Sequence, residues 1–186
     1  MPSLDTLLVF LGTALVLGFT PGPDNLFVLM QSATQGRRAG IAVVLGLCTG
    51  IVVHTTAVAL GLAALLAASP LAFTVMKGAG AAYLLYLAVG AWRAPAAALP
   101  GAAQAAAEPL AVLYRRGIVM NLSNPKVLLF FFALLPQFVM ADRGPVALQL
   151  AVLGGVFILS TLISFGAIAW AAGLLGERLR RSPGLQ

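Results

Sequence analysis

Apolar stretches of roughly 20 residues follow one another along most of the 186-residue chain, and about 20 helical residues cross a hydrocarbon core about 30 Å thick. Hydrophobic residues make up 61% of the sequence and charged residues 9%, against about 45–50% and 25% in soluble domains. The alternating pattern of an outer-membrane β-barrel is absent. We therefore predict one all-α transmembrane domain over residues 1–186, a polytopic helix bundle.

The apolar runs predict five membrane spans, the first and fourth of which are interrupted. These spans cover Leu4–Ala33, Ile41–Ala67, Leu71–Trp92, Gly117–Met140 and Val146–Leu175. Residues 94–114, between the third and fourth spans, are rich in alanine and proline. We interpret them as a flexible cytoplasmic linker with a short helical end, which separates a first half (1–93) from a second, partial half (115–186).

The arginines predict the orientation of these spans. With the N-terminus outside, only Arg143 falls in an outer loop, and eight arginines fall in the inner loops and tail. Those eight are Arg37, Arg38, Arg93, Arg115, Arg116, Arg178, Arg180 and Arg181. Under the positive-inside rule this bias predicts an N-out, C-in topology. The formal charge of +6 is then a topology signal and does not indicate a nucleic-acid partner.

The stretch GFTPGPDNLF places Pro21 and Pro23 around Gly22 inside the first span. Proline within a helix removes a backbone hydrogen bond and clashes with the preceding turn, so the helix should open here. Irregular backbone at membrane depth survives only where it is buried in protein or lines a water-filled cavity. The break should therefore face the interior of the bundle.

A second break is predicted in NLSNPKVLLFFF, where Asn124 suits a helix N-cap and Pro125 the first position of a new helix. Aligning Pro23 with Pro125 superposes GPDNLFVLM on NPKVLLFFF and sets Asp24 opposite Lys126. The two halves also cross the membrane in opposite directions. Interrupted helices at corresponding positions of two such halves indicate a secondary transporter with an inverted repeat.

Asp24 precedes Arg37 by 13 residues and Lys126 follows Arg116 by 10, which places both charges roughly 15–20 Å of helix from the inner face and near the midplane. Lys126 and the half-helix N-termini could attract a substrate carboxylate, while Asp24 holds an ammonium group or takes up a coupling proton. A permanent ion pair that fixes the two halves together is the alternative. The predicted substrate-binding residues are Gly22, Pro23, Asp24, Asn25, Asn121, Asn124, Pro125 and Lys126.

His54, the only histidine, is a second candidate for proton coupling because histidine is the side chain that most readily exchanges a proton near neutral pH. It could equally be a hydrogen-bonded packing residue beside Thr55 and Thr56. No metal or cofactor site is predicted. The single cysteine, Cys48, and the absence of a GxSG motif or a second midplane aspartate argue against an intramembrane enzyme. A channel or a non-catalytic subunit of a larger complex remains open.

Three segments in succession resemble the lysine exporter (LysE/RhtB-type) family: FTPGPDNLFVLMQSATQGRRAGIAVVLGLCTGIVVH, VMKGAGAAYLLYLAVGAWR and GIVMNLSNPKVLLFFFALLPQFV. The resemblance implies proton-driven export of amino acids or derivatives, such as threonine, homoserine, leucine or lysine, across the bacterial inner membrane. Members of this family commonly carry a sixth hydrophobic segment, which is absent from this sequence. Either the sequence is truncated, or lipid or another subunit covers the corresponding surface, and a homo-oligomer is one such arrangement.

Overall fold

The computed structural model describes residues 1–69, 71–72, 74–75, 78, 82 and 107–181. Within these residues all regular structure is helical, which confirms the prediction of an all-α bundle. Most of the predicted third span, Leu71–Trp92, and most of the linker over 94–114 lie outside the described residues.

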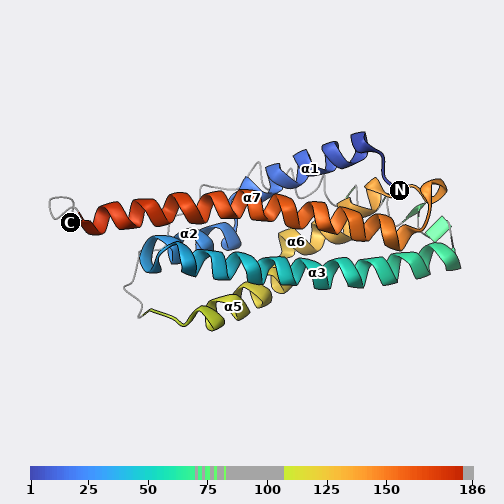
Figure 1. Ribbon diagram of the computed structural model, residues 1–186. Coiled ribbons are helices and arrows are strands. Elements are labelled where there is room, and N and C mark those ends of the chain that lie inside the picture. Colours follow the sequence, from blue (N-terminus) through green and yellow to red (C-terminus); the bar gives the residue numbers. More distant parts are fainter. Residues whose placement is uncertain (70, 73, 76–77, 79–81, 83–106, 182–186) are drawn as a thin grey trace.

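Two long helices form the centre of the bundle, α3 (Arg37–Ala68) and α7 (Val146–Arg181). They lie side by side and run in opposite directions (Figure 1). Their segments Arg37–Gly61 and Val146–Arg178 are each long and apolar enough to cross a membrane. The predicted second and fifth spans are confirmed as helices, and both helices extend beyond the predicted limits.

Two bent helix pairs correspond to the predicted interrupted spans. Helices α1 (Leu4–Phe19) and α2 (Pro23–Gln35) meet at 64°, and α5 (Leu110–Ser123) meets the helical segment Pro125–Phe138 at 51°. Each pair is long and apolar enough to count as one span. The pairs traverse the bundle in opposite directions (Figure 1).

Before the second break, α5 begins at Leu110, so the short helical end expected of the linker is continuous with the span predicted from Gly117. Pro109 is the N-cap of this helix, and Arg116 pairs with Glu108 at 2.6 Å. Beyond the break, a short α-helix, a π-helical turn and a 3₁₀ turn follow one another. These are α6 (Pro125–Leu129), η1 (Phe130–Leu134) and η2 (Leu135–Phe138), followed by the short η3 (Ala141–Arg143). The sequence pattern did not indicate these changes of helical period.

Glycines allow α3 and α5 to approach closely. A methyl group on Gly46 would meet the Tyr114 carbonyl and the Cα of Gly117, and one on Gly50 would lie 2.5 Å from Asn121 Oδ1. Small residues spaced four apart let membrane helices pack backbone against backbone. The GLCTG pattern at residues 46–50 therefore brings α3 up to the second break.

The bundle contains two separate apolar clusters. The phenylalanine cluster lies toward the end with the N-terminus and contains Phe10, Phe130, Phe131, Phe157 and neighbouring aliphatic side chains. The aliphatic cluster lies toward the end with the C-terminus. It consists of Val28, Ala39, Val43, Val44, Leu47, Leu113, Phe165 and Ala169. The proline breaks come between the two clusters, about halfway along the bundle (Figure 1).

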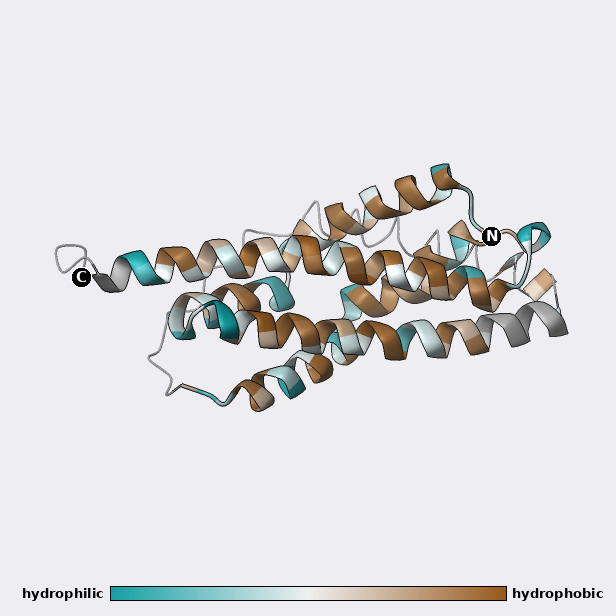
Figure 2. Ribbon diagram, viewed as in Figure 1, coloured by the Kyte–Doolittle hydropathy of each residue, from teal (hydrophilic) through white to brown (hydrophobic). Residues whose placement is uncertain are grey.

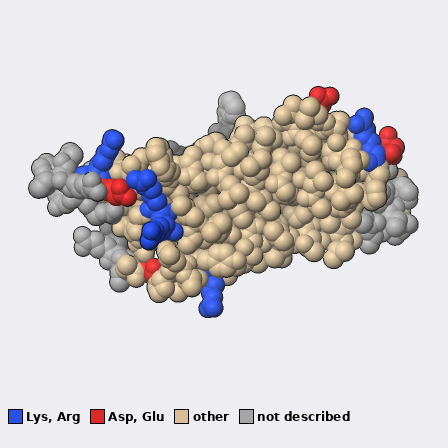
Figure 3. Space-filling view, viewed as in Figure 1, with Lys and Arg blue, Asp and Glu red and all other residues tan. Residues whose placement is uncertain are grey.

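Hydropathy and charge vary along the bundle as a membrane protein requires. Apolar residues occupy most of its length, with polar positions at the ends and at the breaks (Figure 2). Charged side chains gather toward the two ends of the visible face (Figure 3). Arg37 pairs with Glu177 at the C-terminal end, at 3.2 Å, and the Arg143 carbonyl contacts the N-terminal amine at the other end. The described arginines thus lie where the predicted topology requires, while the N-out orientation stays a prediction.

Candidate functional site

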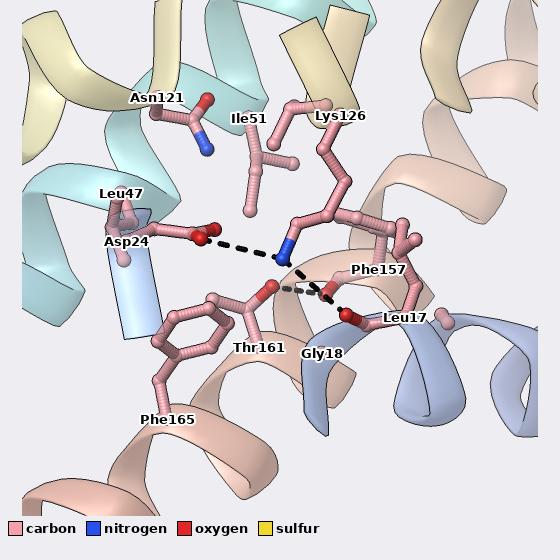
Figure 4. A pocket seen from close by; sticks show the side chains of 12 residues that line it. Leu17, Gly18, Asp24, Leu47, Ile51, Asn121, Lys126, Phe157, Thr161 and Phe165 are labelled. Carbon is pink, nitrogen blue, oxygen red and sulfur yellow. Dashed lines mark hydrogen bonds and ion pairs between the residues drawn. The ribbon is translucent and has the colours of Figure 1, made fainter. Parts of the chain in front are cut away.

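The two breaks meet in the interior, where Lys126 Nζ lies 3.3 Å from Asp24 Oδ1 (Figure 4). The Asp24 side chain is 4% exposed and that of Lys126 is 19% exposed. The sequence alignment of the two halves set these residues opposite each other, and the structure brings their charges into contact. A buried ion pair of this kind is costly to desolvate and strongly destabilising to break on one side, by about 3–5 kcal/mol.

The first break holds Asp24 at the beginning of α2. Gly22 is the N-cap, Pro23 occupies the first helical position, and Asp24 follows in the first turn. A carboxylate there is favoured by the partial positive charge of the helix N-terminus. A methyl group on Gly22 would lie 2.7 Å from Asp24 Oδ1 and 3.1 Å from Lys126 Nζ, so a larger residue here would displace the ion pair.

Lys126 reaches across to the backbone of α1. Its ammonium donates to the carbonyls of Leu17 at 3.5 Å and Thr20 at 3.2 Å, and to Asn25 Oδ1 at 3.2 Å. Pro21 has no N–H to donate to the Leu17 carbonyl, which accepts from the Thr20 backbone N–H at 3.2 Å as well as from Lys126. Asn25 in turn donates to the Gly18 carbonyl at 2.6 Å. The ammonium therefore adds a donor to the backbone carbonyls at the first break, in addition to its contact with the Asp24 carboxylate.

The second break is closed by different side chains. Asn124 Oδ1 accepts from the Lys126 backbone N–H at 3.0 Å, which is the N-cap contact that the sequence predicted. Pro125 has no N–H to donate to the Asn121 carbonyl. This carbonyl accepts from the Asn124 backbone N–H at 3.2 Å and lies 3.4 Å from His54 Nε2. The His54 ring also stacks on Phe131, with ring centroids 5.4 Å apart.

A small cavity surrounds the ion pair, with about 20 Å³ open to the centre of a water molecule. This space holds about one water. Side chains of α1, α2, α3, α5, α6 and α7 line it (Figure 4). They are Ala14, Leu17, Gly18, Asp24, Leu47, Ile51, Asn121, Lys126, Val127, Phe157, Thr161 and Phe165. Members of both apolar clusters are among them, so the cavity separates the phenylalanine cluster from the aliphatic cluster.

Not all the predicted residues face this cavity. Asp24, Asn121 and Lys126 line it, and Gly22 and Asn25 contact the ion pair. Pro23, Asn124 and Pro125 instead line a groove of about 660 Å³ between α2 and α5. This groove also contains the side chains of Arg115 and Arg116, on the arginine-rich side of the breaks. His54 is buried beside the second break and is not among the residues that line the cavity.

Sequence reasoning missed the wall that α7 supplies. Phe157, Thr161 and Phe165 are four residues apart and therefore lie on one face of the helix, turned toward the ion pair (Figure 4). The buried hydroxyls of Ser160, Thr161 and Ser164 were the available signal. All three donate to carbonyls three or four residues earlier in α7, a pattern that any apolar helix tolerates. Their presence alone does not distinguish a site from packing.

Comparison with known protein families identifies the family of this chain. The family model described as LysE type translocator matches residues 15–185. The chain belongs to the LysE type translocator family. This confirms the resemblance found in the sequence, and the membrane location follows from it together with the apolar helices.

Several relatives of this translocator carry names that describe efflux. The chain is 36% identical over 154 residues to a homoserine/homoserine lactone efflux protein of Salmonella typhimurium, covering 83% of this chain and 74% of that protein. It is 30% identical over 130 residues to a leucine efflux protein of Salmonella choleraesuis, covering 70% and 61%. An uncharacterized membrane protein of Vibrio cholerae is 36% identical over 183 residues, covering 96% and 85%. No solved structure gives a significant match.

Proposed function

We propose that this LysE type translocator exports amino acids or their derivatives from the cytoplasm in exchange for protons. The observation that carries the proposal is the Asp24–Lys126 ion pair, which is enclosed between two proline breaks and two apolar clusters. The names of the relatives, which include homoserine and leucine efflux proteins, support amino acids as the substrate class.

The ion pair suits a zwitterion. A substrate ammonium competes with Lys126 for the Asp24 carboxylate and for the carbonyls of Leu17 and Thr20, which carry the partial negative charge at the end of α1. Lys126, released from those contacts, binds the substrate carboxylate. Each charge of the pair thereby exchanges one partner for another, and no charge is left unpaired in the low-dielectric interior.

The present conformation is closed around the pair, because a space for about one water does not admit an amino acid. On one side the phenylalanine cluster fills the bundle: Phe130 and Phe157 ring centroids are 4.5 Å apart, and those of Phe131 and Phe157 are 5.4 Å apart. On the arginine-rich side the groove between α2 and α5 already reaches Pro23 and Pro125. We place the substrate entrance on this side, which the topology assigns to the cytoplasm.

Proton exchange follows if substrate and proton compete for one carboxylate. Asp24 binds the substrate ammonium in its ionised form and releases it when it is protonated from the outer side. It then loses the proton to the cytoplasm before it binds substrate again. Such a scheme needs only that the two ligands exclude each other at Asp24. His54 is the second candidate, and its contact with the Asn121 carbonyl also supports a purely structural role.

We further propose that residues 1–93 and 115–186 are inverted repeats. Each half contains one proline break, and the two bent helix pairs run in opposite directions. In such transporters the substrate binds where the broken helices of the two halves meet, and one half rocks against the other.

Uptake into inside-out membrane vesicles tests the function. With an imposed pH gradient we expect accumulation of homoserine or leucine above the external concentration, and none after the gradient is collapsed with a protonophore. A channel would only equilibrate the amino acid, with or without the gradient. Equilibration alone would therefore replace the exporter by the channel alternative, and absence of any flux would favour the non-catalytic subunit.

A further inference from the structure

The acidic residues of the chain limit the charge that a substrate can carry. The sequence contains five, and all of them lie in the described residues: Asp5, Asp24, Glu108, Asp142 and Glu177. Asp24 alone lines the cavity. The cavity therefore offers one carboxylate, which in the proposed exporter holds the substrate α-ammonium.

The other four carboxylates are held at the ends of the bundle. Glu108 pairs with Arg116 at 2.6 Å and Glu177 with Arg37 at 3.2 Å. Asp5 lies in the first turn of α1, and Asp142 lies in η3 beside the turn into α7. Each of these four carboxylates lies in or beside the end of a helix. A movement that opens the bundle at the proline breaks would therefore bring none of them to the midplane.

Apart from Asp24 and Lys126, the described residues that line the cavity are uncharged. Leu47, Ile51, Phe157 and Phe165 present apolar surface, and the Thr161 hydroxyl donates to the Phe157 carbonyl at 2.9 Å. The buried Asn121 Oδ1 lies against Gly50 of α3, and the amide nitrogen of the same side chain points toward Asp24 (Figure 4). This neutral amide can hydrogen-bond a substrate hydroxyl, whereas it provides no countercharge for a second ammonium.

We propose that the translocator selects amino acids with an uncharged side chain and discriminates against those with a second positive charge. The side chain lies against the α7 wall formed by Phe157, Thr161 and Phe165, with Asn121 available to a hydroxyl. The inference rests on the proposed amino-acid export and deepens it. A cationic side chain placed there has no partner, and the cost of an unpaired charge at the midplane corresponds to roughly a hundredfold discrimination.

Pairs of amino acids that match in length and differ in charge provide the test. Homoserine and 2,4-diaminobutyrate form one pair, and norleucine and ornithine form the other. We expect gradient-driven uptake of homoserine and norleucine into inside-out vesicles, with kcat/KM for the cationic partners lower by about a hundredfold. Equal transport within both pairs would overturn the inference and leave the exporter intact. Transport of none of the four would overturn the proposed function as well.

Thr161→Asp provides a gain-of-function test, with Thr161→Asn as the uncharged control. A second carboxylate in the α7 wall should raise uptake of 2,4-diaminobutyrate relative to homoserine, while the asparagine variant should not. An unchanged ratio in a correctly inserted Thr161→Asp protein would show that the side chain does not lie against α7. If that variant fails to insert, the comparison of matched substrates in the unmodified chain still decides between the outcomes.

Discussion

Both proline breaks interrupt a membrane span, but they differ in length, bend angle and N-cap. Three residues, Thr20 to Gly22, separate α1 from α2, and the helices meet at 64°. One residue, Asn124, separates α5 from α6, and the bend is 51°. The first break has a glycine N-cap with no side-chain hydrogen bond, whereas Asn124 caps the second with its own side chain. The first break is therefore more open to groups from elsewhere in the bundle.

Each break is completed by the opposite half of the molecule. The Leu17 carbonyl accepts from Lys126 in addition to the Thr20 backbone N–H. The Asn121 carbonyl lies within reach of His54 in addition to the Asn124 backbone N–H. The difference is that Lys126 is a charged, flexible donor that also contacts Asp24, while His54 is a ring packed against Phe131. We infer that the first break exchanges its partners during transport and that the second break is a fixed contact.

Asp24→Asn should have the largest effect, because it removes the carboxylate for which substrate and proton compete. We expect gradient-driven accumulation in inside-out vesicles to fall by about a hundredfold, since the substrate ammonium loses its countercharge. Asp5→Asn, which changes a carboxylate outside the cavity, is the matched control and should transport normally. Undiminished accumulation by Asp24→Asn would contradict the exchange of partners at the first break.

Exchanging the two charges separates transport from a permanent ion pair. In the double variant Asp24→Lys, Lys126→Asp the pair is preserved, but lysine then sits in the first turn of α2, where the helix N-terminus disfavours a cation. We expect a thermal midpoint in detergent above that of Asp24→Lys alone, together with loss of accumulation. Full transport by the double variant would show that the pair only fixes the halves together.

Gly22→Ala should have an intermediate effect on the first break. The added methyl group lies 2.7 Å from Asp24 Oδ1, and a displacement that weakens substrate binding by about 1.4 kcal/mol lowers kcat/KM about tenfold. Gly12→Ala in α1 is the control, because no atom lies within 4 Å of its added Cβ. The comparison is measured as initial uptake rates in vesicles of equal protein content. Equal rates for the two variants would mean that the ion pair has room to shift.

The smallest effect on transport is expected at His54. Glutamine retains a donor for the Asn121 carbonyl, so His54→Gln should still accumulate substrate when a pH gradient is imposed. His54→Phe keeps an aromatic ring but loses the donor, and we expect its stability to fall by about 1 kcal/mol, measured as a lower thermal midpoint. If His54→Gln instead transports without coupling to the gradient, histidine is the proton carrier and the second break is not merely structural.

The sequence predicted the breaks well because their causes are local. A proline removes its own N–H, and asparagine before proline caps the helix that follows. These effects operate within a few residues, so Pro23 and Pro125 mark the beginnings of α2 and α6 as predicted. The membrane-surface boundary of the second pair was not predicted, because the apolar pattern that marks a span does not mark where its helix begins: α5 begins at Leu110, ahead of the apolar run from Gly117.

Composition, apolar periodicity, proline positions and charge by themselves determined that this chain is a helical membrane bundle with two interrupted spans and two midplane charges. Only the tertiary structure decided that Asp24 and Lys126 touch, that His54 closes the second break, and that one face of α7 forms the opposite wall. Those facts depend on how helices far apart in sequence pack. The hydroxyl of Thr161 donates to the Phe157 carbonyl of its own helix, as a hydroxyl on any face of an apolar helix can do. No local pattern could therefore have indicated which face of α7 meets the ion pair.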